Sequence, residues 1–140
     1  MAKSVIQNKR RFLLGTAAGA VIETVLLFAL VSYAQGGYFT YEAFLILLIS
    51  GSIAGLITDY KRDKLIAGFL SAFAPVFLAI IVISLPGLGS SPVGATWGVI
   101  PSNNAIGVVY IVVIATILGS VAGVFGAIGG FIGGVIRSKI

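Results

Sequence analysis

The chain has 140 residues, of which 59% are hydrophobic and 9% charged, with a net charge of +5 and a mean hydropathy of +1.14. Soluble domains carry roughly one-quarter charged residues, so this composition excludes a soluble globular protein. The chain has no Cys and no His, which excludes disulfides, thiolate metal sites and imidazole acid–base catalysis.

The nine Lys and Arg residues form three short clusters that flank long apolar runs. The clusters are Lys3, Lys9, Arg10 and Arg11, then Lys61, Arg62 and Lys64, and finally Arg137 and Lys139. The positive-inside rule therefore predicts that the N-terminus, the turn at residues 59–64 and the C-terminus are cytoplasmic. Such clusters predict the lipid bilayer as a partner, and because no aromatic residues are interleaved with them they do not predict nucleic-acid binding.

Four apolar runs follow one another along the chain, and none shows the alternation of barrel strands. A bilayer core of about 30 Å needs about 20 apolar residues in a helix. The predicted spans are 12–34, 41–58, 65–85 and 105–136, which follow a basic cytoplasmic segment at residues 1–11. The first run exceeds a signal-peptide core of roughly 7–15 residues, so we expect it to be retained. The sequence predicts an all-α multi-pass protein of the cell membrane, with a single four-helix domain over residues 12–140.

The last run is longer than a bilayer requires. As one helix, residues 105–136 would measure about 48 Å, against about 30 Å of hydrocarbon. Splitting the run into two spans would place Arg137 and Lys139 outside, against the charge rule. We therefore expect one tilted or bent helix, or one whose end lies in the interface. The preceding loop, residues 86–104, is predicted to be an outer connection with Trp97 at headgroup level, or else a re-entrant lid.

A short internal repeat suggests how the spans are related. The sequence GSIAGL at residues 51–56 recurs as GSVAGV at residues 119–124, in spans that run in the same direction. The pattern favours two related helical hairpins about an axis along the membrane normal, although small residues also match by chance in membrane helices.

Small residues four positions apart recur in every span and lie on one helix face, where they allow close helix packing. The predicted packing positions include Gly15, Gly19, Gly51, Gly55, Gly119, Gly123, Gly126, Gly130 and Gly134. These stripes could serve only to pack the helices of one chain. Because Gly129 and Gly133 put small residues on a further face of the last span, the sequence favours a homo-oligomer or a subunit of a larger membrane complex, with the last helix at the seam.

Glu23 is the one charged residue deep within a span, close to the midplane. A charge there costs several kcal/mol unless it is paired, hydrated or neutralised, so Glu23 marks a candidate intramembrane polar site. Other candidates for this site are Ser50, Ser52, Ser71, Pro75, which frees the carbonyl of Ser71, and Ser120 or Thr116. Two interpretations stay open: a neutral Glu23 whose hydrogen bond sets the helix register, and a site that binds a proton or a cation.

Motifs for catalysis are missing from the sequence. It contains no phosphate-binding loop after a strand, no carboxylate pair spaced for hydrolysis, and no evident base beside a Ser, Thr or Tyr nucleophile. We therefore predict that the protein is not an enzyme, and that it has no cofactor and no metal site.

Two segments carry a resemblance to known proteins. ISGSIAGLITDYKRDKLIAGFLSAFAP at residues 49–75 and GAIGGFIGGVI at residues 126–136 resemble small glycine-rich archaeal integral membrane proteins of unknown function. The resemblance implies four spans, a charged turn between spans two and three, and a glycine-rich last span; it implies no activity and does not include Glu23. The expected function is that of a structural or accessory subunit acting through glycine-mediated packing and oligomerisation. The alternative is a minimal ion or proton channel or transporter that uses Glu23.

Overall fold

The computed structural model of the chain describes residues 2–33, 41–58, 61–84 and 104–139. Nearly all of these residues belong to four α-helices: α1 (Ala2–Tyr33), α2 (Tyr41–Ile57), α3 (Lys61–Ser84) and α5 (Asn104–Arg137). The all-helical class predicted from the sequence is therefore confirmed. The two predicted roles of the 86–104 loop concern residues 86–103, which lie outside the described part of the chain.

Three of the helices in the described part of the chain are long and apolar enough to cross a membrane. The qualifying stretches are Ile6–Leu30, Asp63–Val82 and Gly107–Arg137. Helix α2 is equally apolar but has 17 residues, which corresponds to about 25 Å and is less than the roughly 30 Å of a bilayer core. Helix α1 starts ten residues before the predicted span, because residues 2–11 contain neither Pro nor Gly to interrupt it.

The long final run forms one continuous helix, α5, with 34 residues. Its length of about 50 Å exceeds the thickness of a bilayer core. This agrees with the sequence-based prediction of a single long helix instead of two short ones.

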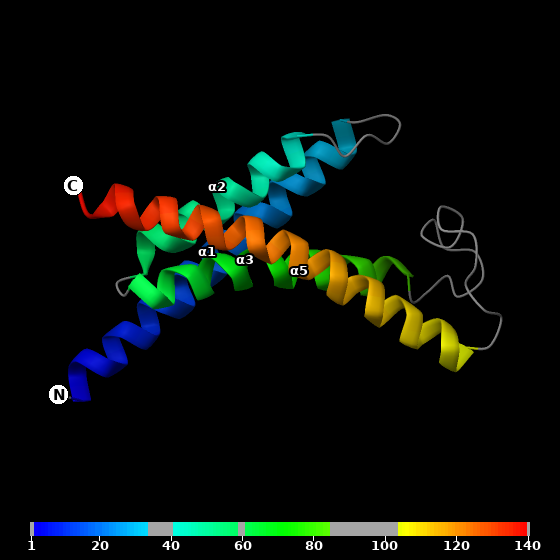
Figure 1. The fold of residues 1–140 in the computed structure, drawn as a ribbon, viewed down its shortest axis with the longest axis horizontal. Coiled ribbons are helices and arrows are strands. Elements are labelled where there is room, and N and C mark those ends of the chain that lie inside the picture. The colour runs from blue at the N-terminus through cyan, green and yellow to red at the C-terminus, as the bar shows by residue number, and fades with distance from the viewer. Residues whose placement is uncertain (1, 34–40, 59–60, 85–103, 140) are drawn as a thin grey trace.

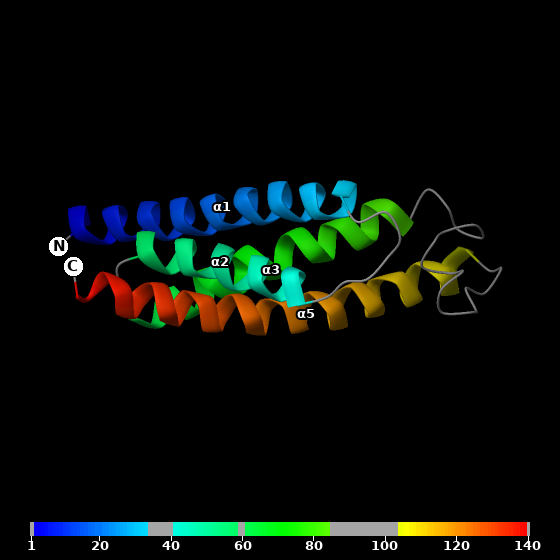
Figure 2. The same cartoon turned by 90° about the horizontal axis from the view of Figure 1, so that it is seen from above.

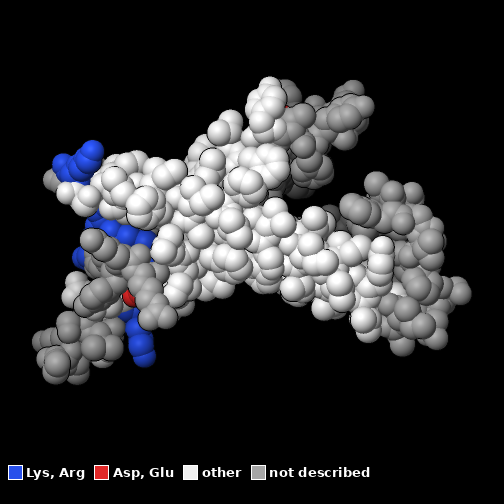
Figure 3. All heavy atoms as spheres, in the orientation of Figure 1, with Lys and Arg blue, Asp and Glu red and all other residues white. Residues whose placement is uncertain are grey.

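The four helices form two antiparallel hairpins that cross each other (Figure 1). Helices α1 and α2 make one hairpin, and α3 and α5 make the other. Viewed at right angles, α1 and α5 lie on opposite sides of the bundle, and each packs against both α2 and α3 (Figure 2). The start of α1, the end of α2, the start of α3 and the end of α5 lie at the same end of the molecule, and the described Lys and Arg side chains gather there (Figure 3). We call this the basic end.

The internal repeat does not describe how the hairpins pack. An axis along the membrane normal would place the two copies of the repeat at the same depth, so Gly51 would lie level with Gly119. In the structure Gly51 lies against Gly126, seven residues further along α5, and Gly55 lies against Gly130. The contacts between α2 and α5 are therefore shifted by about two turns from the repeat.

The interior of the bundle is made of small and polar side chains. Ala54, Ala67, Ala72 and Ala115 are fully buried, and the largest fully buried side chains are Glu23, Thr58, Ser50 and Ser71. Large apolar side chains such as Leu13, Val21 and Phe28 lie on the outside, each more than 60% exposed. Because lipid is as apolar as leucine, this distribution suits a bundle surrounded by hydrocarbon chains.

Candidate functional site

The backbone of α5 lies directly against the backbones of α2 and α3. A Cβ atom added to Gly51 or Gly55 of α2 would collide with the backbone of Gly126 or Gly130 in α5. On the α3 side, a Cβ on Gly126 would collide with the carbonyl of Gly68 and lie 2.6 Å from the Cβ of Ala72. Any side chain at these positions would force the helices apart, so glycine sets their separation.

Other glycines of α5 make room for side chains of α3. The Phe69 and Phe73 rings are stacked with centroids 5.6 Å apart. A Cβ on Gly123 would lie 2.5 Å from the Phe69 ring, and a Cβ on Gly119 would lie 3.1 Å from the Phe73 ring. Near the end of the helix, a Cβ on Gly134 would lie 2.7 Å from Cδ of Lys64.

The second glycine face of α5 is also covered within the chain. A Cβ on Gly129 would collide with the carbonyl of Leu48, and one on Gly133 with the carbonyl of Ser52, both in α2. In α1, a Cβ on Gly15 would lie 2.8 Å from the carbonyl oxygen of Ala54. A Cβ on Gly19 would lie 2.8 Å from the carbonyl oxygen of Ser50. All nine predicted packing glycines thus contact another helix of the same chain, so an oligomer seam would have to use the outward faces.

Glu23 lies inside the bundle with none of its surface exposed. The Ser50 hydroxyl of α2 donates a hydrogen bond of 2.8 Å to its Oε2 atom, and the same hydroxyl lies 3.0 Å from the Leu47 carbonyl. A hydroxyl carries a single hydrogen, so it can donate fully to one of these two acceptors. The other carboxyl oxygen, Oε1, is buried and has no hydrogen-bond partner among the described residues.

The remaining polar residues predicted for this site bond within their own helices. The Ser71 hydroxyl donates to the Gly68 carbonyl at 2.9 Å, although Ser71 also packs against Gly19, one turn before Glu23. Ser52 donates to Leu48, Ser120 to Thr116 and Thr116 to Val112, each four residues back in the same helix. Pro75 lies inside α3 and is half-buried. Of the seven candidates, only Glu23 and Ser50 are joined by a hydrogen bond between two different helices.

At the basic end, Arg137 of α5 closes the C-terminal end of α2. Its Nη1 atom donates to the carbonyl oxygens of Leu56, Ile57 and Thr58 at 3.1, 3.2 and 3.1 Å. The last four carbonyls of a helix have no N–H partner within it, and because Thr58 is only 1% exposed, its carbonyl in particular needs a donor from another part of the protein. The positive charge is also favourable beside the negative end of the helix dipole.

Lys64 of α3 holds a similar place at the end of α5. It is only 9% exposed, its alkyl chain lies along Gly134, and its Nζ atom is 3.5 Å from the Gly134 carbonyl oxygen. Two helices therefore end against a cation supplied by a different helix. The charge pattern predicts which side of the membrane Arg137 and Lys64 occupy, but no local pattern reveals which helix end a distant cation will reach.

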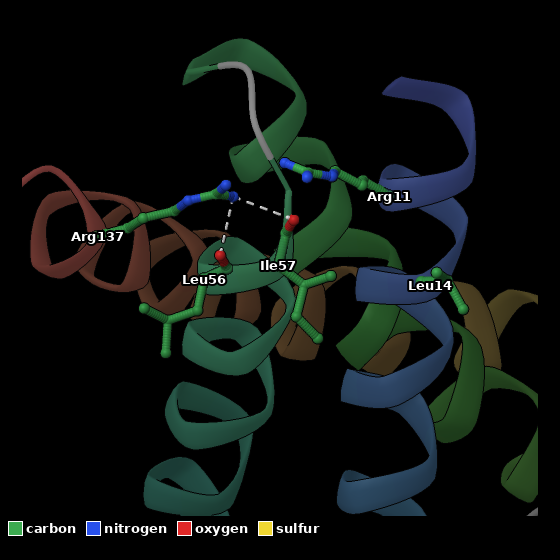
Figure 4. Close-up of a pocket in the computed structure, with 5 residues that line it drawn as sticks. All are labelled: Arg11, Leu14, Leu56, Ile57 and Arg137. Carbon is green, nitrogen blue, oxygen red and sulfur yellow. Dashed lines mark hydrogen bonds between the residues drawn. The ribbon is translucent and has the colours of Figure 1, made fainter. Parts of the chain in front are cut away.

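An open pocket of about 660 Å³ lies beside the end of α2. It is lined by Arg11, Leu14, Leu56, Ile57 and Arg137. Arg11 from α1 and Arg137 from α5 extend toward each other over the last turn of α2 (Figure 4). Sequence reasoning did not anticipate this pocket, since its two arginines come from opposite ends of the chain.

The described residues contain no group of three His, Cys, Asp or Glu side chains that could hold a metal ion. No protein-family model, curated protein or solved structure matches the chain. The resemblance to glycine-rich archaeal membrane proteins therefore stays a prediction, and the functional argument depends on the geometry of the chain itself.

Proposed function

We propose that this chain is a multi-pass protein of the cell membrane that acts as a structural or accessory subunit. The observation that carries the proposal is the position of Glu23, the one ionisable residue deep in the spans. Its side chain is fully buried and bonded to Ser50 of the neighbouring helix, which is what a residue that fixes helix register would do. The close glycine contacts along α5 suit a rigid scaffold as well.

The proposed topology has four spans with both termini in the cytoplasm. Its support is that every basic cluster lies at one end of the bundle, as the positive-inside rule requires. Helix α2 would then cross with a hydrophobic length shorter than the bilayer core, a mismatch that local thinning of the bilayer accommodates at modest cost.

If Glu23 and Ser50 set the helix register, Ser50→Ala and Glu23→Gln should each destabilise the bundle modestly. Interhelical hydrogen bonds of this kind contribute about 0.6–2 kcal/mol in membranes. Unfolding of each single variant and of the double variant in mixed micelles would measure the coupling between the two residues. Strictly additive effects would contradict the interhelical role, and Ser52→Ala, whose hydroxyl bonds within α2, is the matched control.

A second candidate function, a minimal proton or cation pathway, is favoured by one observation. The Oε1 atom of Glu23 is buried without a hydrogen-bond partner among the described residues, which leaves an acceptor for a proton or cation. Flux assays on reconstituted vesicles distinguish the candidates. If Glu23→Gln leaves assembly intact but abolishes an ion flux, the structural proposal fails. If the same variant dissociates the assembly, the transport proposal loses its main support.

We also propose that the chain forms a homo-oligomer or joins a larger membrane complex through the outward row of α5. This row is apolar and exposed along most of the longest helix, and it includes Ile117, Val121, Val124, Ile128 and Phe131. Val124→Trp should lower the subunit count measured by native mass spectrometry without changing the helical circular dichroism. Val21→Trp, equally outward but on α1, is the control; an unchanged count in Val124→Trp would remove α5 from the seam.

A further inference from the structure

We propose that Glu23, Ser50 and Ser71 form a binding site for one sodium ion, where α1 packs against α2 and α3. The ligands of the ion would be the carboxylate of Glu23, the two serine hydroxyls and the main-chain carbonyl of Ser71. This inference deepens the second candidate function and rests on it, because both place a ligand at Glu23. Binding by itself does not require that the ion crosses the membrane.

The carboxyl group of Glu23 lacks a partner for one of its two oxygen atoms. Glu23, Ser50 and Ser71 are all fully buried. Ser50 donates a hydrogen bond of 2.8 Å to Oε2, whereas Oε1 has no hydrogen-bond partner among the described residues. A buried acceptor without a partner is unfavourable, and native proteins usually satisfy such an atom with water or an ion. Oε1 is therefore the atom of the site that calls for a ligand from outside the chain.

The helices around Glu23 bring no cation to its level. In α1 itself, Arg11 lies twelve residues earlier, or about 18 Å along the helix. In α3, Lys64 lies seven residues, or about 10 Å, before Ser71. The single charged residue of α2 is Glu42, in its first turn. One carboxylate is balanced by a proton or by one monovalent cation, whereas a divalent ion would leave an uncompensated charge inside the bilayer.

Glycine at position 19 lets oxygen atoms of both neighbouring helices approach Glu23. A Cβ atom on Gly19 would lie 2.8 Å from the Ser50 carbonyl oxygen of α2 and 3.0 Å from the Ser71 hydroxyl of α3. Gly19 lies one turn before Glu23, and helical side chains point back toward the N-terminus, so the Glu23 carboxyl group lies over the same turn. Its bond to the Ser50 hydroxyl agrees with this placement. Three helices therefore each bring a polar oxygen to one place.

Pro75 makes a further oxygen atom available in α3. In a regular helix the Ser71 carbonyl would accept a hydrogen bond from the N–H of residue 75, but proline has no N–H. Because residues four apart share one helix face, this carbonyl lies on the side of α3 that faces Gly19. Hard cations prefer several oxygen ligands, whereas a bound proton needs one acceptor only. Since the helices are in close contact at Gly19, the smaller Na⁺ suits the site better than K⁺.

The test is the sodium dependence of unfolding, measured on the purified full-length chain in mixed micelles, with choline chloride keeping the ionic strength constant. Because Na⁺ would bind only the folded bundle, each tenfold rise in Na⁺ above its dissociation constant should raise the folded-to-unfolded ratio about tenfold. The same replacement with KCl should change the ratio by less than about twofold, as for a general salt effect. Glu23→Gln should abolish the sodium dependence.

Variants of α3 test the other ligands. Ser71→Ala removes one hydroxyl and should raise the Na⁺ concentration needed for the same stabilisation roughly tenfold. Pro75→Ala should act in the same direction, because alanine supplies the N–H that engages the Ser71 carbonyl. Loss of the helix cannot explain that result, since alanine is the better helix former. Ser52→Ala, whose hydroxyl bonds within α2, is the matched control and should leave the sodium dependence unchanged.

Three results would overturn the proposal. Equal stabilisation by Na⁺ and K⁺ would be a general salt effect. A sodium dependence retained in Glu23→Gln would place the ion elsewhere, and no sodium dependence in the parent chain would mean that the site binds no sodium. Flux assays on vesicles keep this inference apart from the pathway on which it rests. Sodium binding without flux keeps the site and removes the pathway, whereas a proton flux that needs Glu23, without sodium binding, does the reverse.

Discussion

Gly126→Ala is expected to destabilise the bundle by about 2 kcal/mol or more, in the range reported for overpacked interiors. Two effects oppose each other at this position. Alanine is the better helix former by about 1 kcal/mol, which alone would stabilise α5. The added methyl, however, would collide with the Gly68 carbonyl and lie 2.6 Å from the Cβ of Ala72, so α3 and α5 would have to separate. Packing drives helix association in lipid, so the collision outweighs the propensity.

The measurement for Gly126→Ala is equilibrium unfolding in mixed micelles, followed by circular dichroism. Val124→Ala on the outward face of the same helix is the matched control and should change the free energy of unfolding by less than about 0.5 kcal/mol. A Gly126→Ala protein more stable than the parent would contradict the backbone contact. Gly51→Ala, which places a methyl on the opposite side of the same contact, should reproduce the loss.

Arg137→Gln is expected to cost about 2–3 kcal/mol, because hydrogen bonds from a charged group are worth about 1.5–3 kcal/mol and partly buried acceptors would be left without this donor. Its local effect should be confined to the last turn of α2, whose carbonyls Arg137 contacts. Hydrogen exchange should therefore accelerate at residues 54–58 more than elsewhere in α2. Arg137→Lys, which keeps the charge but has a smaller reach and no fork, should be intermediate.

Lys139→Gln provides the comparison for Arg137. Lys139 is exposed and two residues further along, so removing it deletes the same unit of charge from the same cluster. We expect a change within about 0.5 kcal/mol, as for most surface substitutions. If both variants lost the same stability, the contribution of Arg137 would come from the overall charge of the basic end and not from closing α2.

The features of the fold that depend on long stretches of sequence could be predicted. The apolar runs located α2, α3 and α5 to within four residues at each end, and the charge pattern correctly favoured one long last helix. Helix α1 begins ten residues before the predicted first span, because nothing in residues 2–11 interrupts a helix. The short length of α2 was also visible in the sequence, since the predicted second span has 18 residues and α2 has 17.

Less of the site could be predicted, because it depends on contacts between distant residues. Spacing showed that glycines would face neighbouring helices, but not that Gly126 would lie between Gly51 and Gly68. The sequence marked Glu23 as a candidate polar site deep within a span, and the structure buries it, yet Ser50 was only one of several hydroxyl candidates for its partner. Arg137 acts on α2 through a contact across 80 residues, which no local pattern encodes.

The bond from Arg137 to α2 has a consequence for the order in which the protein matures. Helix α2 leaves the ribosome long before Arg137 is synthesised, since 80 residues separate that arginine from Ile57. During this interval the terminal carbonyls of α2 depend on water or on lipid headgroups for their hydrogen bonds. The terminal carbonyls of α2 therefore receive the Arg137 donor only after α5 has been inserted. In a nascent chain that stops before α5, the first hairpin lacks this donor.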